Sequence, residues 1–342
     1  MITALALFVT GGLIGWAVGH FAMPLGQRFG LMDYPDPDGG RKLHAQATPL
    51  VGGLALVAAT SVAIAAMLWL GSEAVNSSVL VWFQMTVAGL FLVGALDDRI
   101  GLTAPTRLAA ASAFLLAAIA QVPDFSVNFL LFSGQSNLLL MQGLFGVAFT
   151  LLCFVGLLNA VNMADGKNGL VIGQAIVWAA VLMVRLPPSM LPLMAAIMGA
   201  LMVLFFYNMQ GKLFLGDGGS YGLSAMFGLL GIYAWNHGFA DMYADDVALI
   251  FAVPVFDTLR LIVHRLAKGK SPFTPGRDHL HHYLYARWGW PRPLPWVLML
   301  VAVPNLLAIL LPGTGIIWLG VTLIGYLGLL WAANAQPRAR PA

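Results

Sequence analysis

Long stretches of this chain carry no Asp, Glu, Lys or Arg, and they limit what it can fold into. The longest runs from Pro293 to Pro337, and another covers Phe125 to Ala164. Each exceeds the roughly 20 apolar residues that a membrane-spanning helix needs. With 60% hydrophobic and 9% charged residues and a mean hydropathy of +0.84, the chain cannot fold as a water-soluble globule. The sequence therefore predicts an all-α polytopic membrane protein.

The apolar stretches resolve into about eleven membrane-spanning helices, or about ten if either the fourth or the ninth does not cross. The fourth is short and rich in alanine, and the ninth carries Asp257 and Arg260. The predicted spans are residues 2–24, 50–70, 78–96, 105–122, 139–158, 168–184, 189–208, 219–236, 246–266, 294–311 and 315–333.

The positive charges orient these helices, because Lys and Arg collect in short cytoplasmic loops. With the N-terminus outside and the C-terminus in the cytoplasm, only Arg185 of the 17 Lys and Arg residues lies on the outer side. The net charge of +3 then indicates contact with anionic membrane lipids, and no nucleic-acid partner is expected. We expect a single membrane domain over residues 1–335 and a short cytoplasmic tail at 336–342.

Five polar inserts fall on the cytoplasmic side in this topology. They contain Arg41 to His44, Asp97-Asp98, Asn159 to Gly169, Leu215 to Ser220 and Arg277 to His282. Polar groups gathered at one face of a membrane protein are typical of a functional site. These acids, amides, glycines and histidines predict a site for a charged, phosphorylated substrate.

Two of the inserts carry acids that suit metal binding. Asp97 and Asp98 are adjacent at the end of the third span, where a hard cation such as Mg²⁺ would relieve their repulsion. Asp217 lies among glycines directly before the eighth span, so the first amides of that helix and the acid can meet a phosphate together. Each pattern also has a purely structural interpretation, as a capped helix end and as a glycine-rich turn.

Two further inserts carry amides and histidines. Asn162, Asp165 and Asn168 lie on one face if their segment is helical, or around a ligand if it unwinds at Gly166. Amide side chains suit both a metal's ligand set and the edge of a nucleobase. The segment from Arg277 to His282 has three histidines but no cysteine nearby, so phosphate binding is favoured over zinc. A polar helix break and a charged loop are the structural alternatives.

Taken in order, and with the run from Thr48 to Gly53, these inserts resemble the polyprenyl-phosphate N-acetylhexosamine-1-phosphate transferases. The resemblance covers residues 28–285, and its motifs are specific jointly rather than singly. It implies transfer of a HexNAc-1-phosphate from a UDP-sugar to undecaprenyl phosphate at the cytoplasmic face of a bacterial inner membrane, with release of UMP. It also implies Mg²⁺ or Mn²⁺ as cofactor, and it is compatible with a homodimer. Such a transfer starts a lipid-linked glycan, such as a lipopolysaccharide O-antigen or a cell-wall polymer.

The resemblance also implies roles for individual residues. Asp97, Asp98 and Asp217 would be catalytic, with the first two at the acceptor phosphate. The metal would be held by Asp217, Asn162 and Asp97. The substrate-binding residues would be Lys42, His44, Asn162, Asp165, Asn168, Arg277, His279, His281 and His282.

One position departs from the bacterial pattern of that family. The pattern usually reads Asp-Gly-x-Asp-Gly, and this chain has Asn168 at the second acid, as the eukaryotic branch does. An acid can only accept a hydrogen bond from a uracil N–H, whereas an amide both donates and accepts. The segment from Arg277 to His282 resembles the group that starts O-antigen synthesis more than the murein translocase. That likeness implies UDP-GlcNAc as donor and leaves GalNAc and deoxy-HexNAc donors open.

Other functions remain open from the sequence alone. A transporter or flippase for lipid-linked sugars would suit the number of spans and the intramembrane Asp257 and Arg260, although no internal repeat is visible. A non-catalytic binder of polyprenyl-linked sugars would suit Asn168. For an enzyme, both a direct displacement and a two-step route with an Asp nucleophile are compatible with the sequence, and we favour the former.

Overall fold

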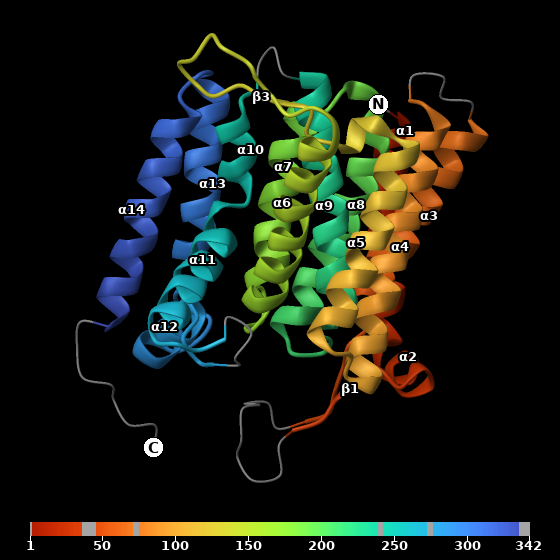
Figure 1. Ribbon diagram of the computed structural model, residues 1–342. Coiled ribbons are helices and arrows are strands. Elements are labelled where there is room, and N and C mark those ends of the chain that lie inside the picture. Colours follow the sequence, from red (N-terminus) through yellow and green to blue (C-terminus); the bar gives the residue numbers. More distant parts are fainter. Residues whose placement is uncertain (1, 36–45, 71–74, 239–241, 272–275, 335–342) are drawn as a thin grey trace. The chain divides into compact units, whose positions relative to one another are not determined.

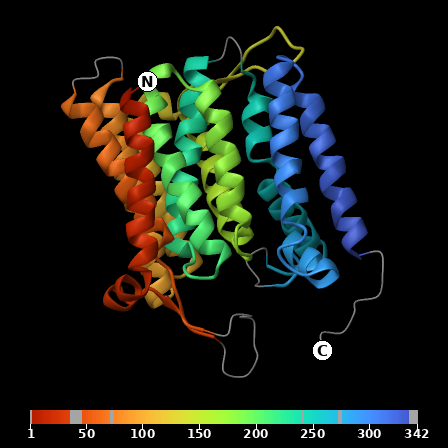
Figure 2. The same cartoon turned by 180° about the vertical axis from the view of Figure 1, so that it is seen from behind.

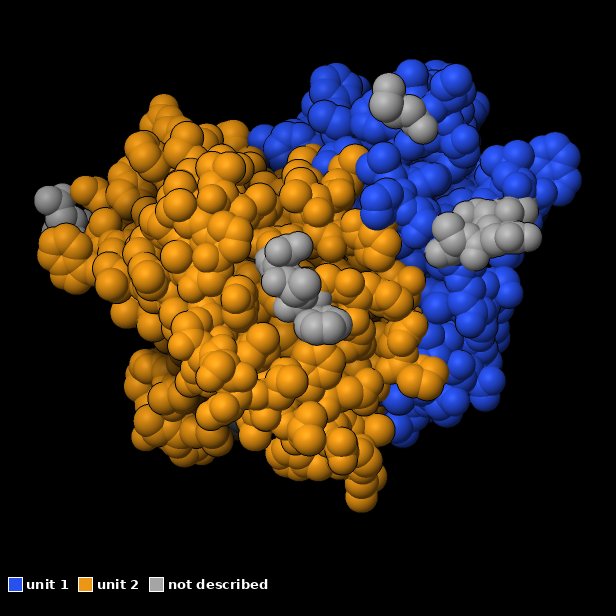
Figure 3. Space-filling model, turned by 90° about the horizontal axis from the view of Figure 1, so that it is seen from above, with its two compact units in different colours: residues 1–122, 188–226 blue, residues 123–187, 227–342 orange. Residues whose placement is uncertain are grey.

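The computed structural model describes residues 2–35, 46–70, 75–238, 242–271 and 276–334. Helices make up most of these residues (Figure 1), and the strands form two short antiparallel pairs. The prediction of an all-α protein is thus confirmed. The chain divides into two compact units (Figure 3), and this division does not test the prediction of one domain over residues 1–335. The predicted tail at 336–342 lies outside the described residues.

Unit 1 comprises residues 1–122 and 188–226. Its helices and strands are α1 (Ile2–His20), α2 (Ala22–Phe29), β1 (Met32–Asp33), β2 (Thr48–Pro49), α3 (Gly52–Trp69), α4 (Ser77–Ile100), α5 (Ala104–Gln121), the 3-10 turn η2 (Pro188–Met190), α8 (Leu191–Met209) and the first part of α9 (Gly216–Gly238).

Small residues allow α1 and α8 to run closely side by side in unit 1 (Figure 2). A Cβ atom at Gly11 would collide with the backbone of Ala196, and one at Gly199 would collide with the carbonyl oxygen of Phe8. Such close backbone contact is the usual way in which helices associate in lipid, where burial of apolar surface gives little advantage.

A strand pair and a neighbouring loop lead the chain to the start of α9. In the antiparallel pair of β1 and β2, Met32 lies opposite Pro49. The carbonyl oxygen of Pro49 accepts a hydrogen bond from the N–H of Phe214 at 2.8 Å, and the N–H of Gly52 donates to the carbonyl oxygen of Phe214 at 3.0 Å. Since α3 begins at Gly52 and α9 at Gly216, these bonds hold the beginnings of the two helices together.

Unit 2 comprises residues 123–187 and 227–342. Its helices and strands are the 3-10 turn η1 (Pro123–Phe125), β3 (Phe129–Leu130), β4 (Leu139–Leu140), α6 (Gly143–Ala164), α7 (Leu170–Arg185), the second part of α9, α10 (Ala244–Ile250), α11 (Ala252–Ala267), α12 (Leu280–Trp288), α13 (Leu294–Leu310) and α14 (Gly315–Asn334).

Aromatic and apolar side chains form the interior of unit 2. The fully buried Trp178 of α7 packs edge-on against Phe227 and Phe251, with ring centroids 5.6 and 5.3 Å apart. A second cluster joins Leu249 and Ala252 to Ala308 of α13. These contacts tie α7, α9, α10, α11 and α13 into one unit.

The predicted ninth span is broken in the structure. Its two halves, α10 and α11, meet at Phe251 with a bend of 82° (Figure 1). Pro254 explains the break, because a proline lacks the N–H that would bond the carbonyl of Ile250 and its ring collides with that carbonyl. The bend gives α11 a direction of its own, and α11 carries Asp257 and Arg260.

Seven helices among the described residues are long and apolar enough to cross a membrane, or eight if α10 and α11 form one bent span. Each segment predicted as a span is mainly helical, although the one at 139–158 begins with β4. Helices α7 and α13 are shorter than a full span, and glycine and polar residues lower the hydropathy of α9. A polytopic membrane protein is thereby confirmed. The count of eleven or ten spans and the orientation of the termini stay predictions.

Candidate active site

The acids of two predicted clusters meet in unit 1, where the last turn of α4 reaches the first turn of α9. The carboxylate of Asp98 accepts hydrogen bonds from the N–H of Asp217 at 3.0 Å and from the N–H of Gly218 at 3.1 Å. The first N–H groups of a helix have no partner within the helix, and they carry its positive dipole end. Asp98 therefore satisfies two such groups and lies beside Asp217.

Glycines make this close approach possible. A Cβ atom at Gly94 of α4 would collide with the backbone of Asp217. Gly216 has φ +72°, which L-residues rarely adopt, and a Cβ there would lie 2.7 Å from Oδ2 of Asp98. The glycines at this contact thus allow the backbones of α4 and α9 to pack closely, in addition to any contact that they make with a ligand.

Asp97 is buried and has partners of its own. Its Oδ2 accepts from the guanidinium of Arg107 at 2.6 Å, and its Oδ1 accepts from the N–H of Leu102 at 2.7 Å. A charge-assisted bond to Arg is among the stronger hydrogen bonds in proteins. Arg107 was not predicted as a site residue. Its position three residues into α5, near the same end of unit 1 as the two acids, is the signal that could have indicated it.

The donor atoms in unit 1 suit Mg²⁺. This ion is usually bound by one or two carboxylates and completed by substrate phosphates and water. Asp97, Asp98 and Asp217 supply carboxylate oxygens only, which fits a hard cation. Among the described residues, no three or more His, Cys, Asp or Glu side chains lie close enough together to hold a metal ion on their own. Substrate phosphate and water would therefore have to supply the remaining ligands of Mg²⁺. The third predicted ligand, Asn162, belongs to unit 2.

The three predicted histidines cluster in unit 2, at the beginning of α12. The rings of His279 and His281 stack with centroids 5.5 Å apart, and those of His281 and His282 are 4.2 Å apart. Burial, followed by the neighbouring imidazoles, lowers the pKa of His281 well below its ordinary value and that of His282 to about 4. Both rings are therefore neutral near pH 7, and each offers one N–H donor and one acceptor.

The predicted amide segment unwinds between two helices. Helix α6 ends at Ala164 and α7 begins at Leu170, so Asn162 is helical while Asp165 and Asn168 lie in the connection. The unwound interpretation is confirmed, and the three groups do not continue along one helix face. The side chain of Asn162 and that of Asp165 are each half-buried.

The connection between α6 and α7 contacts α12 and the segment after it. Gly166 packs directly against the ring of His281, where a Cβ atom would collide with Nε2. The ammonium of Lys167 lies 3.8 Å from the centroid of the Tyr285 ring, and Trp290 donates to the carbonyl oxygen of Asn168 at 2.8 Å. Two predicted clusters, 165–169 and 279–282, are thus brought together within unit 2.

Lys167 and Arg277 give this part of unit 2 a positive charge. Burial, and then the charge of Arg277, lowers the pKa of Lys167. Arg277 is exposed in the loop before α12. Both are placed to attract an anion to the histidine cluster. Lys42 and His44, which were predicted to assist with phosphates, lie outside the described residues.

A buried acid that was not predicted as a site residue holds the histidine loop. Asp257 of α11 accepts from Nδ1 of His279 at 2.8 Å and from the N–H of Leu280 at 3.1 Å. Arg260 and Tyr326 also donate to this carboxylate, at 2.9 and 2.8 Å. In the sequence, Asp257 and Arg260 had only suggested transport.

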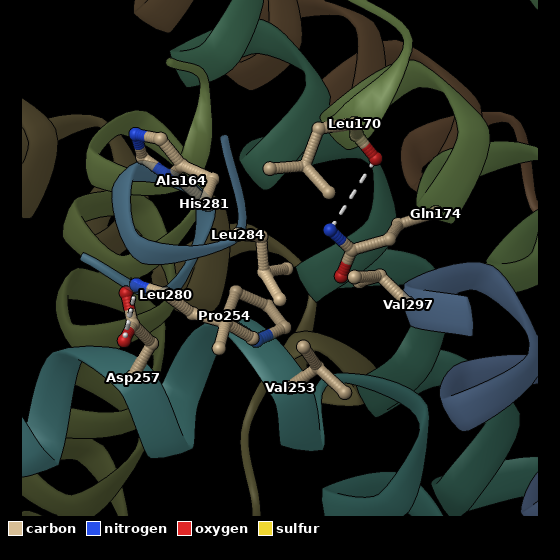
Figure 4. Close-up of a pocket in the computed structure, with 10 residues that line it drawn as sticks. All are labelled: Ala164, Leu170, Gln174, Val253, Pro254, Asp257, Leu280, His281, Leu284 and Val297. Atoms are coloured by element: carbon tan, nitrogen blue, oxygen red, sulfur yellow. Dashed lines mark hydrogen bonds between the residues drawn. The ribbon is translucent and has the colours of Figure 1, made fainter. Parts of the chain in front are cut away.

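A small pocket in unit 2 lies beside these groups (Figure 4). It is lined by Ala164, Leu170, Gln174, Val253, Pro254, Asp257, Leu280, His281, Leu284 and Val297. Its volume of about 20 Å³ is enough for one water molecule. Ligand sites for molecules of drug size are many times larger, so this pocket does not itself hold a nucleotide sugar.

These features define a class of protein, an integral membrane protein with polar clusters at its helix ends. In unit 1 the cluster consists of acids beside backbone N–H donors, and in unit 2 it consists of imidazoles beside cationic side chains. The model of glycosyl transferase family 4 matches residues 79–235, which include the acids of unit 1 and the amide segment but not the histidines.

Named relatives extend the similarity to most of the chain. The undecaprenyl-phosphate alpha-N-acetylglucosaminyl 1-phosphate transferase of Salmonella typhi is 30% identical over 330 residues, which are 92% of this chain and 84% of the relative. The enzyme of the same name from Escherichia coli K12 is 30% identical over 84% of this chain and 78% of the relative. The decaprenyl-phosphate N-acetylglucosaminephosphotransferase of Mycolicibacterium smegmatis is 29% identical over 81% of this chain and 74% of the relative.

The chain belongs to the polyprenyl-phosphate N-acetylhexosamine-1-phosphate transferases of glycosyl transferase family 4.

Proposed function

We propose that this protein transfers GlcNAc-1-phosphate from UDP-GlcNAc to undecaprenyl phosphate and releases UMP. The observation that carries this proposal is the similarity to transferases named for GlcNAc and a polyprenyl phosphate, over 84% of the length of one of them. The geometry agrees with it, because Asp98 and Asp217 lie together at the positive end of a helix in unit 1.

The reaction brings several negative charges together, so its catalysis must consist mainly of positioning and charge neutralisation. An oxygen of the acceptor phosphate attacks the phosphorus that carries the sugar, and the bond from that phosphorus to the oxygen of UMP breaks. The bonding electrons leave with UMP. We favour this direct displacement, which needs no covalent bond to an Asp.

The acids of unit 1 would act on the acceptor and its metal. Asp98 is held in place by two N–H groups, and Asp97 by Arg107, so both carboxylates have fixed orientations. We assign them to the acceptor phosphate, and Asp217 to Mg²⁺ together with Asp97 and Asn162. When bound, Mg²⁺ would neutralise the diphosphate of the donor.

The groups of unit 2 would bind the donor. Asp165 and Asn168 are assigned to the nucleoside, and Arg277 with the three histidines to the pyrophosphate and the amino sugar. Neutral imidazoles suit this task, because each can donate one hydrogen bond to a phosphate oxygen or a sugar hydroxyl.

The hypothesis of a transporter loses one of the two observations that suggested it, the intramembrane charges. Asp257 and Arg260 pair with each other at 2.9 Å and with the histidine loop, which explains their presence in an apolar helix without transport. We further propose that the protein crosses a bacterial inner membrane eleven times and that its active site faces the cytoplasm. Labelling of single cysteines introduced into each loop, in a Cys153→Ser background, would test this topology. A homodimer stays a prediction.

The function is tested with purified protein, undecaprenyl phosphate, Mg²⁺ and a panel of UDP-sugars. We expect UMP and the lipid-linked sugar diphosphate with UDP-GlcNAc, and loss of both products on chelation and in Asp217→Ala. Asp124→Asn, which changes an exposed acid in η1, is the matched control and should retain activity. Absence of product with every UDP-HexNAc, from folded wild-type protein, would overturn the proposal.

A further inference from the structure

The carboxylate of Asp257 is almost fully engaged by hydrogen-bond donors from three parts of unit 2. Its Oδ1 accepts from Arg260 at 2.9 Å, from the hydroxyl of Tyr326 at 2.8 Å and from the N–H of Leu280 at 3.1 Å. Its Oδ2 accepts from Nδ1 of His279 at 2.8 Å. Only 6% of Asp257 and 1% of Tyr326 are exposed. A buried network of this kind is rigid when all its members are satisfied.

The network determines which nitrogen of His279 carries a hydrogen. A carboxylate can only accept, so Nδ1 of His279 must bear the hydrogen that lies between them. The second nitrogen, Nε2, is then the one left for another partner. A hydrogen bond at one ring nitrogen sets the state of the other in this way in many histidine sites.

The network also fixes the backbone on both sides of His279. Leu280 is bonded to Asp257 through its N–H, and Arg260 donates to the carbonyl oxygen of Asp278. Arg260 in turn reaches the hydroxyl of Tyr326 at 2.7 Å. The ring and the main chain of His279 are therefore held by the same group of three side chains.

We propose that Asp257, supported by Arg260 and Tyr326, is a positioning residue that orients His279 so that Nε2 faces the pyrophosphate of the nucleotide sugar. This inference rests on the proposed function, which places His279 at that pyrophosphate. Asp257 does not touch the substrate and acts only through His279. Arg260 and Tyr326 keep its carboxylate turned toward the ring.

Asp257→Asn is the sharpest test, because it keeps the shape of the side chain and replaces one hydrogen-bond acceptor, a carboxylate oxygen, with a donor, the amide NH₂. Oδ1 faces three donors, so the amide oxygen must take that place and the amide NH₂ must face His279. Nδ1 would then have to accept, and the hydrogen would move to Nε2. The same exchange in a serine-protease triad leaves the geometry intact and selects the wrong tautomer.

We expect Asp257→Asn to lower kcat by about 100-fold or more while the KM for undecaprenyl phosphate stays within about threefold. His279→Asn should give a similar loss, since Asn can still donate to Asp257 but has no counterpart of Nε2. In the His279→Asn background, Asp257→Asn should reduce kcat by less than about threefold, because residues that act as a unit are not additive.

Asp124→Asn provides the matched control. It alters a different Asp–His pair of unit 2, Asp124 with His237 at 3.2 Å, in which both side chains are substantially exposed. Its activity should stay within about twofold of the wild type. A thermal unfolding curve of each variant reports whether the protein is folded.

The outcomes separate this inference from the proposed function. An inactive but folded wild type overturns the proposed function. An active wild type with full activity in Asp257→Asn, or with losses that multiply in the double variant, overturns only the role of Asp257. If Asp257→Asn does not fold, Tyr326→Phe replaces it in the same cycle: a loss of about threefold to tenfold that disappears in the His279→Asn background supports the inference, and any other result refutes it.

Discussion

Gly216→Ala tests whether the position of Asp98 determines activity. Gly216 precedes Asp217 at the start of α9, with φ +72°. A Cβ atom there would lie 2.7 Å from Oδ2 of Asp98, about 0.7 Å closer than the 3.4 Å at which ordinary contact begins. The backbone of α9 is packed against α4, so the carboxylate of Asp98 must move most. Leu50, whose Cβ would lie 3.0 Å from the new atom, must yield by a smaller amount.

The expected cost has two parts. An alanine in the left-handed region costs about 1–2 kcal/mol of unfolding free energy, whatever its neighbours. The second part is displacement of the carboxylate, and a misplacement of about 1 Å in an active site can reduce the rate about 100-fold. We therefore expect kcat to fall about tenfold to 100-fold, which exceeds what the loss of stability explains in protein that remains folded.

Gly101→Ala is the matched control in the same unit. Gly101 follows α4 and has φ +66°, and a Cβ atom there would meet nothing within 4 Å, so the variant carries the backbone cost without the collision. Both variants should unfold at similarly reduced temperatures, and Gly101→Ala should keep its rate of UMP release within about threefold. Equal losses of activity in the two variants would refute the role given to the position of Asp98.

Three further predictions concern unit 2. Gly166→Ala should displace the ring of His281 and lower kcat about tenfold or more, whereas Gly156→Ala, with open space beside it in α6, should leave the rate unchanged; equal rates would contradict the packing. The pKa of His282 is lowered to about 4 from an ordinary 6.5, so the unfolded chain binds the proton more readily and stability is lost as the pH falls through that window. The unfolding temperature should therefore drop less between pH 6.5 and 4 in His282→Asn, and an unchanged slope would refute the shift. Asn168→Asp should alter the KM for UDP-GlcNAc but not the unfolding temperature, because Trp290 bonds to the main chain of residue 168; a KM change for the lipid acceptor alone would argue against a nucleoside contact.

Much of the fold could be predicted because lipid imposes one simple requirement on each segment. Every segment predicted as a span is mainly helical in the structure, since in lipid all backbone groups must bond within the segment. The break in the ninth stretch was also within reach of the sequence, because Pro254 cannot bond to the carbonyl of Ile250. What composition could not determine is which of these helices cross the membrane.

The candidate site was predictable where its residues are neighbours in sequence or share a motif. The pairing of Asp97 with Arg107 spans only ten residues, and the place of Arg107 at the start of the helix that follows the two acids could have indicated it. The bond between Asp257 and Tyr326 joins residues 69 apart, and it depends on how α11 and α14 pack. Such partners emerge from tertiary structure, so single-sequence reasoning could assign Asp257 only to a generic intramembrane charge.

Both units stabilise carboxylates that are removed from water, and they do so in the same way. A carboxylate taken out of water is costly unless donors replace the lost solvent. Asp98 receives two backbone N–H groups, Asp97 receives Arg107 and a backbone N–H, and Asp257 receives Arg260, Tyr326, His279 and a backbone N–H. Because these donors are in place before any substrate arrives, the acids need not reorganise when a phosphate approaches. That preorganisation is what a transfer between two anionic phosphates requires, since its barrier is dominated by bringing like charges together.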